Sequence, residues 1–330
     1  MTLNDVAERV GVSARTVSRV VNGQGGCSPE TLERIQAAIR DLGYRPNLMA
    51  RALLTNRSDT VGLVGVEMSD PFFTELADGV QRAAREAGHT MFFASTDDVP
   101  ARQTEVLDAL LGHGASGAIV FPAQGSLGDV IAAAEHGLPI VLVNHELTAP
   151  RIGCVLNDLW SGARTAVEHL IASGRRRIAM ITDVNNLRLQ AEPRRLSGYR
   201  EALTRAGIPL DDALVVLEDN TVEGGRQATS RLLALDDRPD AIFAFNDLMA
   251  IGALQELGSH GVSVPDDVAV IGFDDIAMCE YVSPRLTTVR IDREELGRTA
   301  VELLWEIAAH PTEALAPVRV PVELVLRESA

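Results

Sequence analysis

Two arginines near the start of the chain have the type and spacing to read a base sequence. Arg15 and Arg19 are four residues apart, so they lie on one face of a helix. Ser13 can cap the start of that helix. Its buried side is predicted to consist of three valines, Val17, Val20 and Val21. Its outward face then carries Ala14, Arg15, Ser18 and Arg19. Because the arginine fork matches O6 and N7 of guanine, Arg15 and Arg19 are candidates for direct base contacts in a major groove.

Two further short helices are predicted to hold this one in place. The first starts at Thr2, has Asp5 in its first turn and stops at Gly11. The third follows Ser28-Pro29, a cap followed by a first-turn proline, and runs to about Asp41 before Gly43. The first two helices, separated by a short turn, have the spacing of a helix-turn-helix.

The charge of this first segment differs in sign from that of the chain. The first 58 residues contain eight arginines and five acids, whereas the whole chain has a formal net charge of −16. A basic head on an acidic body indicates a module that binds a polyanion. The alternative is that the head is the first helical part of an enzyme and that its arginines form a solvated face.

The next stretch decides between these readings. Residues 43–47 read Gly-Tyr-Arg-Pro-Asn and residues 50–53 read Ala-Arg-Ala-Leu. Together with Leu-Asn-Asp-Val-Ala at 3–7 and Val-Ser-Ala-Arg-Thr-Val-Ser-Arg-Val-Val-Asn-Gly at 12–23, they make the chain similar to the LacI/GalR family of bacterial transcription regulators. The resemblance implies a helix-turn-helix headpiece at 1–46, a hinge helix and linker at 47–59, and an effector-binding and dimerisation domain at 60–330.

The resemblance also implies which residues touch DNA. In the family the hinge helix orders on the operator, so Asn47 is expected to cap it, Ala50 to allow close approach and Leu53 to enter the minor groove as a wedge. The alternative for Leu53 is packing within a linker helix. The expected DNA-contacting residues are Ala14, Arg15, Thr16, Ser18, Arg19, Asn22, Tyr44, Asn47, Ala50 and Leu53.

Beyond residue 60, short apolar runs alternate with helical segments. Buried parallel strands are predicted at 61–66, 91–94, 118–121, 140–143, 178–181, 241–245 and 268–271, with helices such as 74–87 and 223–234 between them. This alternation, with a weak internal repeat, predicts an α/β body of two similar halves. The resemblance makes it a two-lobed periplasmic-binding-protein-like (type I) sensor. Lobe one is then about 60–158 and 291–321, and lobe two about 161–287 and 322–330.

Polar residues follow several of these strands, where α/β folds bind ligands. By resemblance, Phe72 and Phe73 form a wall, Arg195 donates twice to ligand oxygens and Asp274 accepts from hydroxyls. The expected effector-binding residues are Phe72, Phe73, Asn144, Arg195, Asn220, Asn246 and Asp274. This mixture suits a sugar, because a carboxylate and a guanidinium can each bind two hydroxyls while an aromatic side chain covers the face of the sugar ring. Asn220 stands where some relatives carry a stacking aromatic, which weakens the case for a nucleoside, the alternative effector.

Simpler roles are open for several neighbours of these residues. Asn246 and Asp247 can cap the helix that follows them, and for Asp247 capping is the favoured reading. Arg194 is expected to be a surface charge, and Asp275 to cap or turn the chain rather than touch a ligand.

Other classes of protein find little support in the sequence. The seven histidines and three cysteines show no metal-ligand spacing, and no nucleophile elbow or phosphate-binding glycine loop occurs, so we expect no enzyme, metal or cofactor. Without a signal peptide or a membrane span, a cytoplasmic protein is expected and a secreted sugar-binding protein is disfavoured. The sequence therefore predicts a homodimeric repressor of carbohydrate-utilisation genes. Its expected partners are double-stranded operator DNA and a small effector, which we expect to be a sugar.

Overall fold

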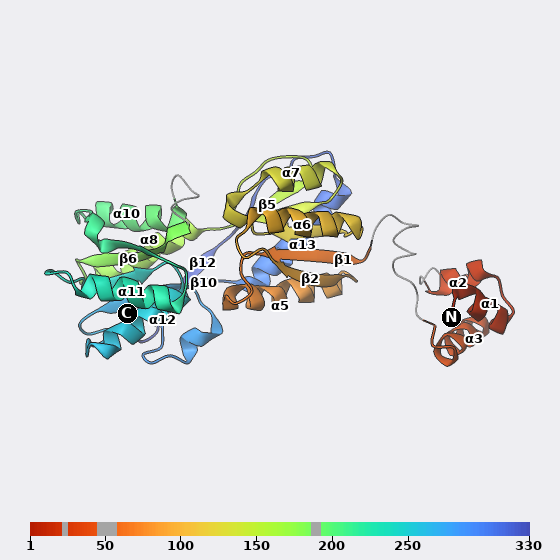
Figure 1. Cartoon of the computed structure of the whole chain (residues 1–330), viewed down its shortest axis with the longest axis horizontal. Helices are drawn as coiled ribbons and strands as arrows, with labels where there is room; N and C mark the ends of the chain where they lie inside the picture. The colour runs from red at the N-terminus through yellow and green to blue at the C-terminus, as the bar shows by residue number, and fades with distance from the viewer. Residues whose placement is uncertain (22–25, 45–57, 186–192) are drawn as a thin grey trace. The chain divides into compact units, whose positions relative to one another are not determined.

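The computed structural model describes residues 1–21, 26–44, 58–185 and 193–330, which form two compact units, Met1–Ser58 and Asp59–Ala330 (Figure 1). Of the residues expected to contact DNA, Asn22, Asn47, Ala50 and Leu53 lie outside the described residues.

The first unit contains the three predicted helices, α1 (Leu3–Val10), α2 (Ala14–Val21) and α3 (Pro29–Asp41). Thr2 and Asp5 form a capping box at α1, Gly11 ends α1 with φ +76°, and Ser28 caps α3. The shared core consists of Val6, Ala7, Val10, Val17, Ile35 and Ala38. The predicted buried stripe of α2 is narrower than expected: Val17 is fully buried, whereas Val20 and Val21 only border the core.

The second unit contains two six-stranded sheets, each the centre of one lobe (Figure 1). The lobe-one sheet has the order β11-β5-β4-β3-β1-β2, with β1 (Thr60–Gly65), β2 (Thr90–Ser95), β3 (Gly117–Val120), β4 (Ile140–Val143), β5 (Ile152–Asn157) and β11 (Val318–Val320). The lobe-two sheet has the order β12-β10-β9-β8-β6-β7, with β6 (Ile178–Asp183), β7 (Val215–Glu218), β8 (Ala241–Ala244), β9 (Ala269–Asp274), β10 (Thr287–Ile291) and β12 (Val322–Val325). All named pairings are parallel except that of β10 with β12.

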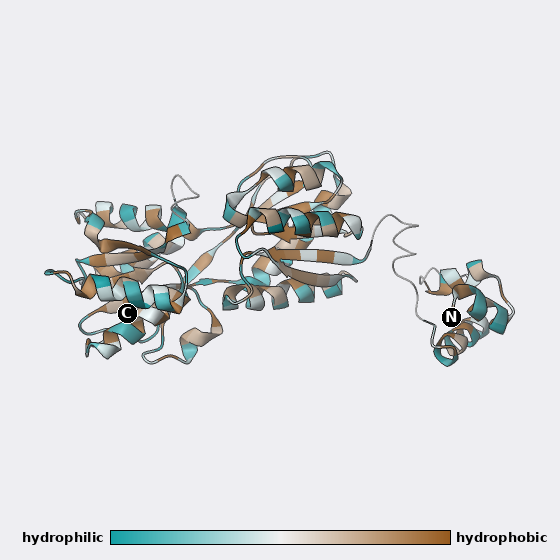
Figure 2. Cartoon of the chain, in the orientation of Figure 1, coloured by the Kyte–Doolittle hydropathy of each residue, from teal (hydrophilic) through white to brown (hydrophobic). Residues whose placement is uncertain are grey.

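Helices cover both faces of each sheet. In lobe one, α5 (Pro71–Glu86) and α13 (Arg293–Ala309) pack together, as do α6 (Pro100–Gly112) and α7 (Gly128–Glu135). In lobe two, the pairs are α8 (Leu159–Ala172) with α10 (Arg194–Arg205), and α11 (Val222–Leu233) with α12 (Asp247–Ser259). Short 3-10 turns lie at η1 (Ala123–Gly125), η2 (Asp212–Leu214) and η3 (Ala277–Glu280). Figure 2 shows the result of this layering: apolar residues concentrate on the strands and inward helix faces, and polar residues lie outside.

The chain passes between the sheets at three places: from β5 into α8, from β10 into α13, and from β11 into β12. These connections bring the carboxyl ends of strands from both lobes toward a common region. None of the described helices is long and apolar enough to cross a membrane.

The predicted α/β class is confirmed, and the seven predicted strands are present with ends shifted by a few residues. The prediction of a buried strand at 91–94 is wrong in one respect, because β2 lies at the sheet edge and leaves Phe92 60% exposed. β5, β7, β10, β11 and β12 were not predicted. The helix expected at 74–87 begins earlier, at Pro71, because Asp70 caps it.

Candidate functional site

The outward side of α2 presents both predicted base-reading arginines. Arg15 and Arg19 are exposed, and the Arg19 guanidinium lies close to Gly26, where a Cβ atom would collide with it. Arg34 has a different role, because its Nη2 donates to the Val10 carbonyl at 2.7 Å and so closes the end of α1. The exposed arginines of α2 are therefore available for a partner, whereas Arg34 holds the unit together.

The other described residues of this surface are small or only partly exposed. Ala14, Thr16 and Ser18 are half-buried, and the hydroxyl of Thr16 lies 2.9 Å from that of Ser13 at the helix start. Tyr44 packs against the core of the first unit. Thr16 and Tyr44 thus have structural contacts in addition to their expected place near DNA.

The second unit contains a cavity of about 230 Å³ between the lobes. Its lining includes every residue expected to bind the effector: Phe72, Phe73, Asn144, Arg195, Asn220, Asn246 and Asp274. Residues separated by as much as two hundred positions meet there because each follows, or lies near, the carboxyl end of a parallel strand.

An aromatic cluster forms the lobe-one wall of this cavity. Asp70 caps α5 through a hydrogen bond from the Phe72 amide to its Oδ1 at 2.9 Å, and this fixes the two phenylalanines in the first turn. The Phe73 ring meets Phe121 edge to face, with centroids 4.9 Å apart. Phe72 packs on both rings in the same manner. The three rings of this wall therefore pack on one another and are largely buried.

Asn144 directly follows β4 and has a left-handed conformation, with φ +59°. Its Oδ1 accepts hydrogen bonds from the Asn157 backbone amide at 3.0 Å and from Asn157 Nδ2 at 3.1 Å. Since the oxygen is occupied, Asn144 presents its NH2 group as a donor. Beside it, His145 Nδ1 donates to the Val143 carbonyl at 3.2 Å, and burial lowers the pKa of His145, so its Nε2 is the acceptor of a neutral ring.

The lobe-two side is dominated by a buried ion pair. Arg195 Nη2 lies 3.0 Å from Asp274 Oδ1, and the guanidinium carbon lies 4.4 Å and 4.1 Å from the ring centroids of Phe245 and Phe273. Burial lowers the pKa of Arg195 and raises that of Asp274, and each partner's charge opposes the other's shift. The carboxylate and the fork are thus held by one another and by the rings, which pre-orients both.

A pair of asparagines completes this side. Asn246 caps α12 by accepting from the Met249 amide at 3.0 Å, and its Nδ2 donates to Asn220 Oδ1 at 2.5 Å. Both groups of the Asn246 amide therefore have partners within the protein. Asn220, whose oxygen is occupied, presents its NH2 group to the cavity.

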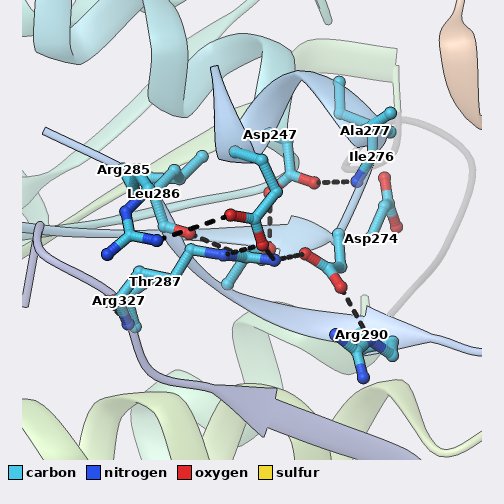
Figure 3. Close-up of polar contacts among 12 residues, drawn as sticks. Asp247, Asp274, Ile276, Ala277, Arg285, Leu286, Thr287, Arg290 and Arg327 are labelled. Atoms are coloured by element: carbon cyan, nitrogen blue, oxygen red, sulfur yellow. Dashed lines mark hydrogen bonds and ion pairs between the residues drawn. The ribbon is translucent and has the colours of Figure 1, made fainter. Parts of the chain in front are cut away.

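The favoured reading of Asp247 as the cap is wrong, because Asn246 caps α12. Asp247 is buried one residue further on: its Oδ1 accepts from the Thr288 hydroxyl at 2.5 Å and its Oδ2 from the Ile276 amide at 2.9 Å (Figure 3). This arrangement ties α12 to β10 and to the loop that follows Asp274.

The expectations for the neighbours Arg194 and Asp275 have different outcomes. Arg194 is not only a surface charge, since it lines the cavity and pairs at 3.5 Å with Glu146 of lobe one. Asp275 behaves as expected, since it does not line the cavity and its left-handed backbone, with φ +56°, turns the chain after β9. Its carboxylate lies 2.6 Å from Arg290 and 2.7 Å from Arg327.

Several residues that line the cavity are not among the expected effector-binding residues: Asp70, Asp98, Phe121, His145, Asp183 and Phe245. Their position at strand ends was the available signal: Phe121 and Phe245 directly follow β3 and β8, and Asp183 ends β6.

A helix-turn-helix unit joined to a two-lobed α/β unit with a polar interlobe cavity defines the chain as a DNA-binding regulator with a sensor domain. Two family models match it: bacterial regulatory proteins of the lacI family at residues 2–47, and the periplasmic binding protein-like domain at 167–330.

Relatives over nearly the whole length agree with this class. The ribose operon repressor of Escherichia coli strain K12 is 33% identical over 94% of either chain. The structure of the transcriptional regulator CelR with cellobiose is 34% identical, with a TM-score of 0.73 and full coverage of both chains. The lac repressor dimer bound to operator and an anti-inducer is 27% identical, with a TM-score of 0.86, covering all of this chain and 98% of the other. The chain belongs to the LacI family of bacterial transcription regulators and is not an enzyme.

Proposed function

We propose that the chain is a homodimeric repressor that binds a pseudo-palindromic operator and changes its DNA affinity when a carbohydrate occupies the interlobe cavity. The observation that carries the effector part is the Arg195–Asp274 pair, held at 3.0 Å opposite an aromatic wall from the other lobe. A relative solved as a dimer on its operator supports the dimer.

The chemistry of the cavity favours a polyol. Asn144 and Asn220 offer NH2 donors, Asp274 offers acceptor oxygens, and Phe72 and Phe73 supply apolar surface. Sugars carry alternating donors and acceptors around an apolar ring, so such a mixture satisfies both parts. The names of relatives point the same way, since one is a ribose operon repressor and another was solved with cellobiose.

Coupling to DNA follows from the position of the ligand. An effector that touches both lobes favours the lobe arrangement to which it binds better, and the lobes are joined by three chain crossings that permit a change of angle. The change would reach the hinge segment at 47–59, where Asn47, Ala50 and Leu53 are proposed to meet the minor groove.

The DNA part is tested by base readout. Replacing Arg15 or Arg19 with alanine is expected to cost about 1 to 3 kcal/mol at one base position of each half-site, because the bidentate contact to guanine is lost. Arg40→Ala is the matched control, since it removes the same charge from α3, outside the reading surface. The measurement is binding of the full chain to operators that differ at single positions. If an α2 variant weakens binding to all sequences equally, the contact is to phosphate and the base-reading assignment is wrong.

The effector part is tested in two steps. A thermal-shift screen of sugars and nucleosides identifies a ligand, because binding to the native state raises its apparent stability. Asp274→Asn and Arg195→Ala are then expected to bind operator like the parent but to lose most of their response to that ligand, with a cost of roughly 1 to 3 kcal/mol in binding. Calorimetry measures the loss. If both variants bind the ligand with the affinity of the parent, the cavity is not the effector site. If the screen identifies a nucleoside as the ligand, the proposed carbohydrate effector is wrong.

A further inference from the structure

The charges lining the cavity are distributed unevenly between its two sides. Lobe one contributes the carboxylates of Glu67, Asp70 and Asp98, and no arginine lines the cavity from the described part of that lobe. The lining guanidiniums among the described residues, Arg194 and Arg195, both belong to α10 of lobe two.

Both guanidiniums already face a carboxylate. Arg195 lies 3.0 Å from Asp274, and Arg194 lies 3.5 Å from Glu146. Arg195 also stacks between two rings, which limits its freedom to turn toward a new partner. The neutral imidazole of His145 adds no positive charge. An anion in this cavity would therefore meet carboxylates on the lobe-one side, and on the lobe-two side guanidiniums whose charges are each balanced by a paired carboxylate.

Asp70 is the acid best placed to act on a ligand. Its side chain is buried, with the residue only 7% exposed, yet it lines the cavity. Oδ1 accepts the cap hydrogen bond from Phe72, and within the described part of the chain Oδ2 has no hydrogen-bond partner. Because Asp70 lines the cavity, Oδ2 can accept a hydrogen bond from a molecule bound there. Asp98 is anchored in a comparable way, since its Oδ1 accepts from the Gln124 amide at 2.7 Å.

We infer that the cavity selects an effector without phosphate or carboxylate groups, and that Asp70 is a specificity-determining residue that accepts a hydroxyl hydrogen from it. The inference rests on the proposed carbohydrate effector and narrows it to a neutral, unphosphorylated sugar. Asp70 holds the lobe-one end of that sugar, opposite Asp274 on lobe two, and its charge repels the acidic derivatives of the same sugar.

Matched pairs of ligands test the selection on the full-length chain. Ribose, glucose, galactose and cellobiose are titrated beside ribose 5-phosphate, glucose 6-phosphate, galacturonate and cellobionate. A neutral sugar is expected to bind roughly a hundredfold more tightly than its acidic counterpart, as like-charge juxtaposition predicts. Asp70→Asn keeps a capping side chain at α5 but removes the negative charge. This variant should therefore bind the neutral sugar more weakly, and the difference in affinity between the neutral sugar and its acidic counterpart should become smaller. Asp108 is an exposed acid of α6. Asp108→Asn is the control and should change neither the affinity for the neutral sugar nor the difference in affinity within a pair.

The outcomes separate this inference from the function on which it rests. Tighter binding of a phosphorylated or acidic sugar would overturn the inference and leave a carbohydrate effector standing. Binding of a nucleoside and of no sugar would overturn the carbohydrate effector itself.

A measurement without ligand covers the case in which no member of the panel binds. Crowded carboxylates should destabilise the empty protein, so Asp70→Asn should raise the melting temperature relative to Asp108→Asn, whereas Asp70→Ala, which loses the cap, should lower it. A melting temperature lowered by Asp70→Asn would contradict the inference.

Discussion

Asp247 is a buried acid that does not line the cavity. It accepts from Thr288 and Ile276, and the Cβ of any residue at 272 other than glycine would collide with its Oδ1. Burial raises the pKa of Asp247 from 3.8 to about 7, although Thr288, Ile276 and Cys279 lower it by hydrogen bonding. The residue therefore changes charge near neutral pH in the folded protein.

The sign of the effect on stability follows from this shift. Below pH 3.8 both folded and unfolded states hold the proton, whereas between pH 3.8 and about 7 only the folded state does. The free energy of unfolding should fall through this window by up to about 1.4 kcal/mol per pH unit. Asp247→Asn removes the titrating group. The free energy of unfolding of the variant should therefore increase relative to that of the parent as the pH rises from 5 to 7.

Urea unfolding at pH 5, 6, 7 and 8 measures that gain. Asp211→Asn is the control, because hydrogen bonds from Ala213 and Arg177 lower the pKa of Asp211 and place its window below pH 3.8. The difference in free energy of unfolding between Asp211→Asn and the parent should be the same at pH 5 and pH 8. Equal pH slopes for Asp247→Asn and the parent would contradict the raised pKa.

At the scale of elements, two helical glycines distinguish close packing from an open surface. A Cβ on Gly198 of α10 would lie 2.4 Å from the Trp160 carbonyl oxygen of α8, whereas a Cβ on Gly258 of α12 would meet nothing within 4 Å. Gly198→Ala must separate α10 from α8 and should cost about 1 to 3 kcal/mol. Gly258→Ala should stabilise by about 0.5 to 1 kcal/mol, because it only restricts the unfolded chain.

Thermal or urea unfolding of the two variants decides the comparison. A neutral Gly198→Ala would mean that the two helices can move apart without cost. In that case the contact between α8 and α10 would not fix the position of Arg195.

At the scale of the whole molecule, polar contacts join the lobes beside the cavity. Glu75 of α5 accepts from the Ala277 amide of lobe two at 3.0 Å and lies 2.9 Å from Arg293. Arg293 also donates to the carbonyls of Asp274 and Asp275. A change in lobe angle must strain or break these contacts, so their free energy opposes the change that an effector favours.

The proposed dimer makes a geometric prediction about its operator. Two identical headpieces reading a pseudo-palindrome require half-sites on the same face of the duplex. Inserting roughly five base pairs between the half-sites, half a helical turn, should reduce affinity to the non-specific level, and inserting about ten should restore part of it. Gel-shift titration measures both. Unchanged affinity with the half-turn insertion would show that a single headpiece suffices.

The amino-acid sequence was enough to predict local structure, because local structure depends on neighbours in the chain. The caps at Thr2, Ser13 and Ser28 lie beside the amides they bind, and the apolar runs of β4 and β6 identify buried strands without reference to a partner. β7 was missed because its apolar stretch is short, and β10 because it contains Arg290. Only the pairing with a neighbouring strand makes each of them part of a sheet.

Only the tertiary structure decided which polar atoms face the cavity. The sequence places Asn246 and Asp247 side by side, but the paths of α12 and β10 give the cap to Asn246 and bury Asp247 against Thr288. Likewise, Asn157 occupies the oxygen of Asn144, and Asp70 joins Asp274 at one cavity because two sheets meet there. Hydrogen bonds between residues distant in the chain depend on strand order and lobe packing, and no local pattern encodes either.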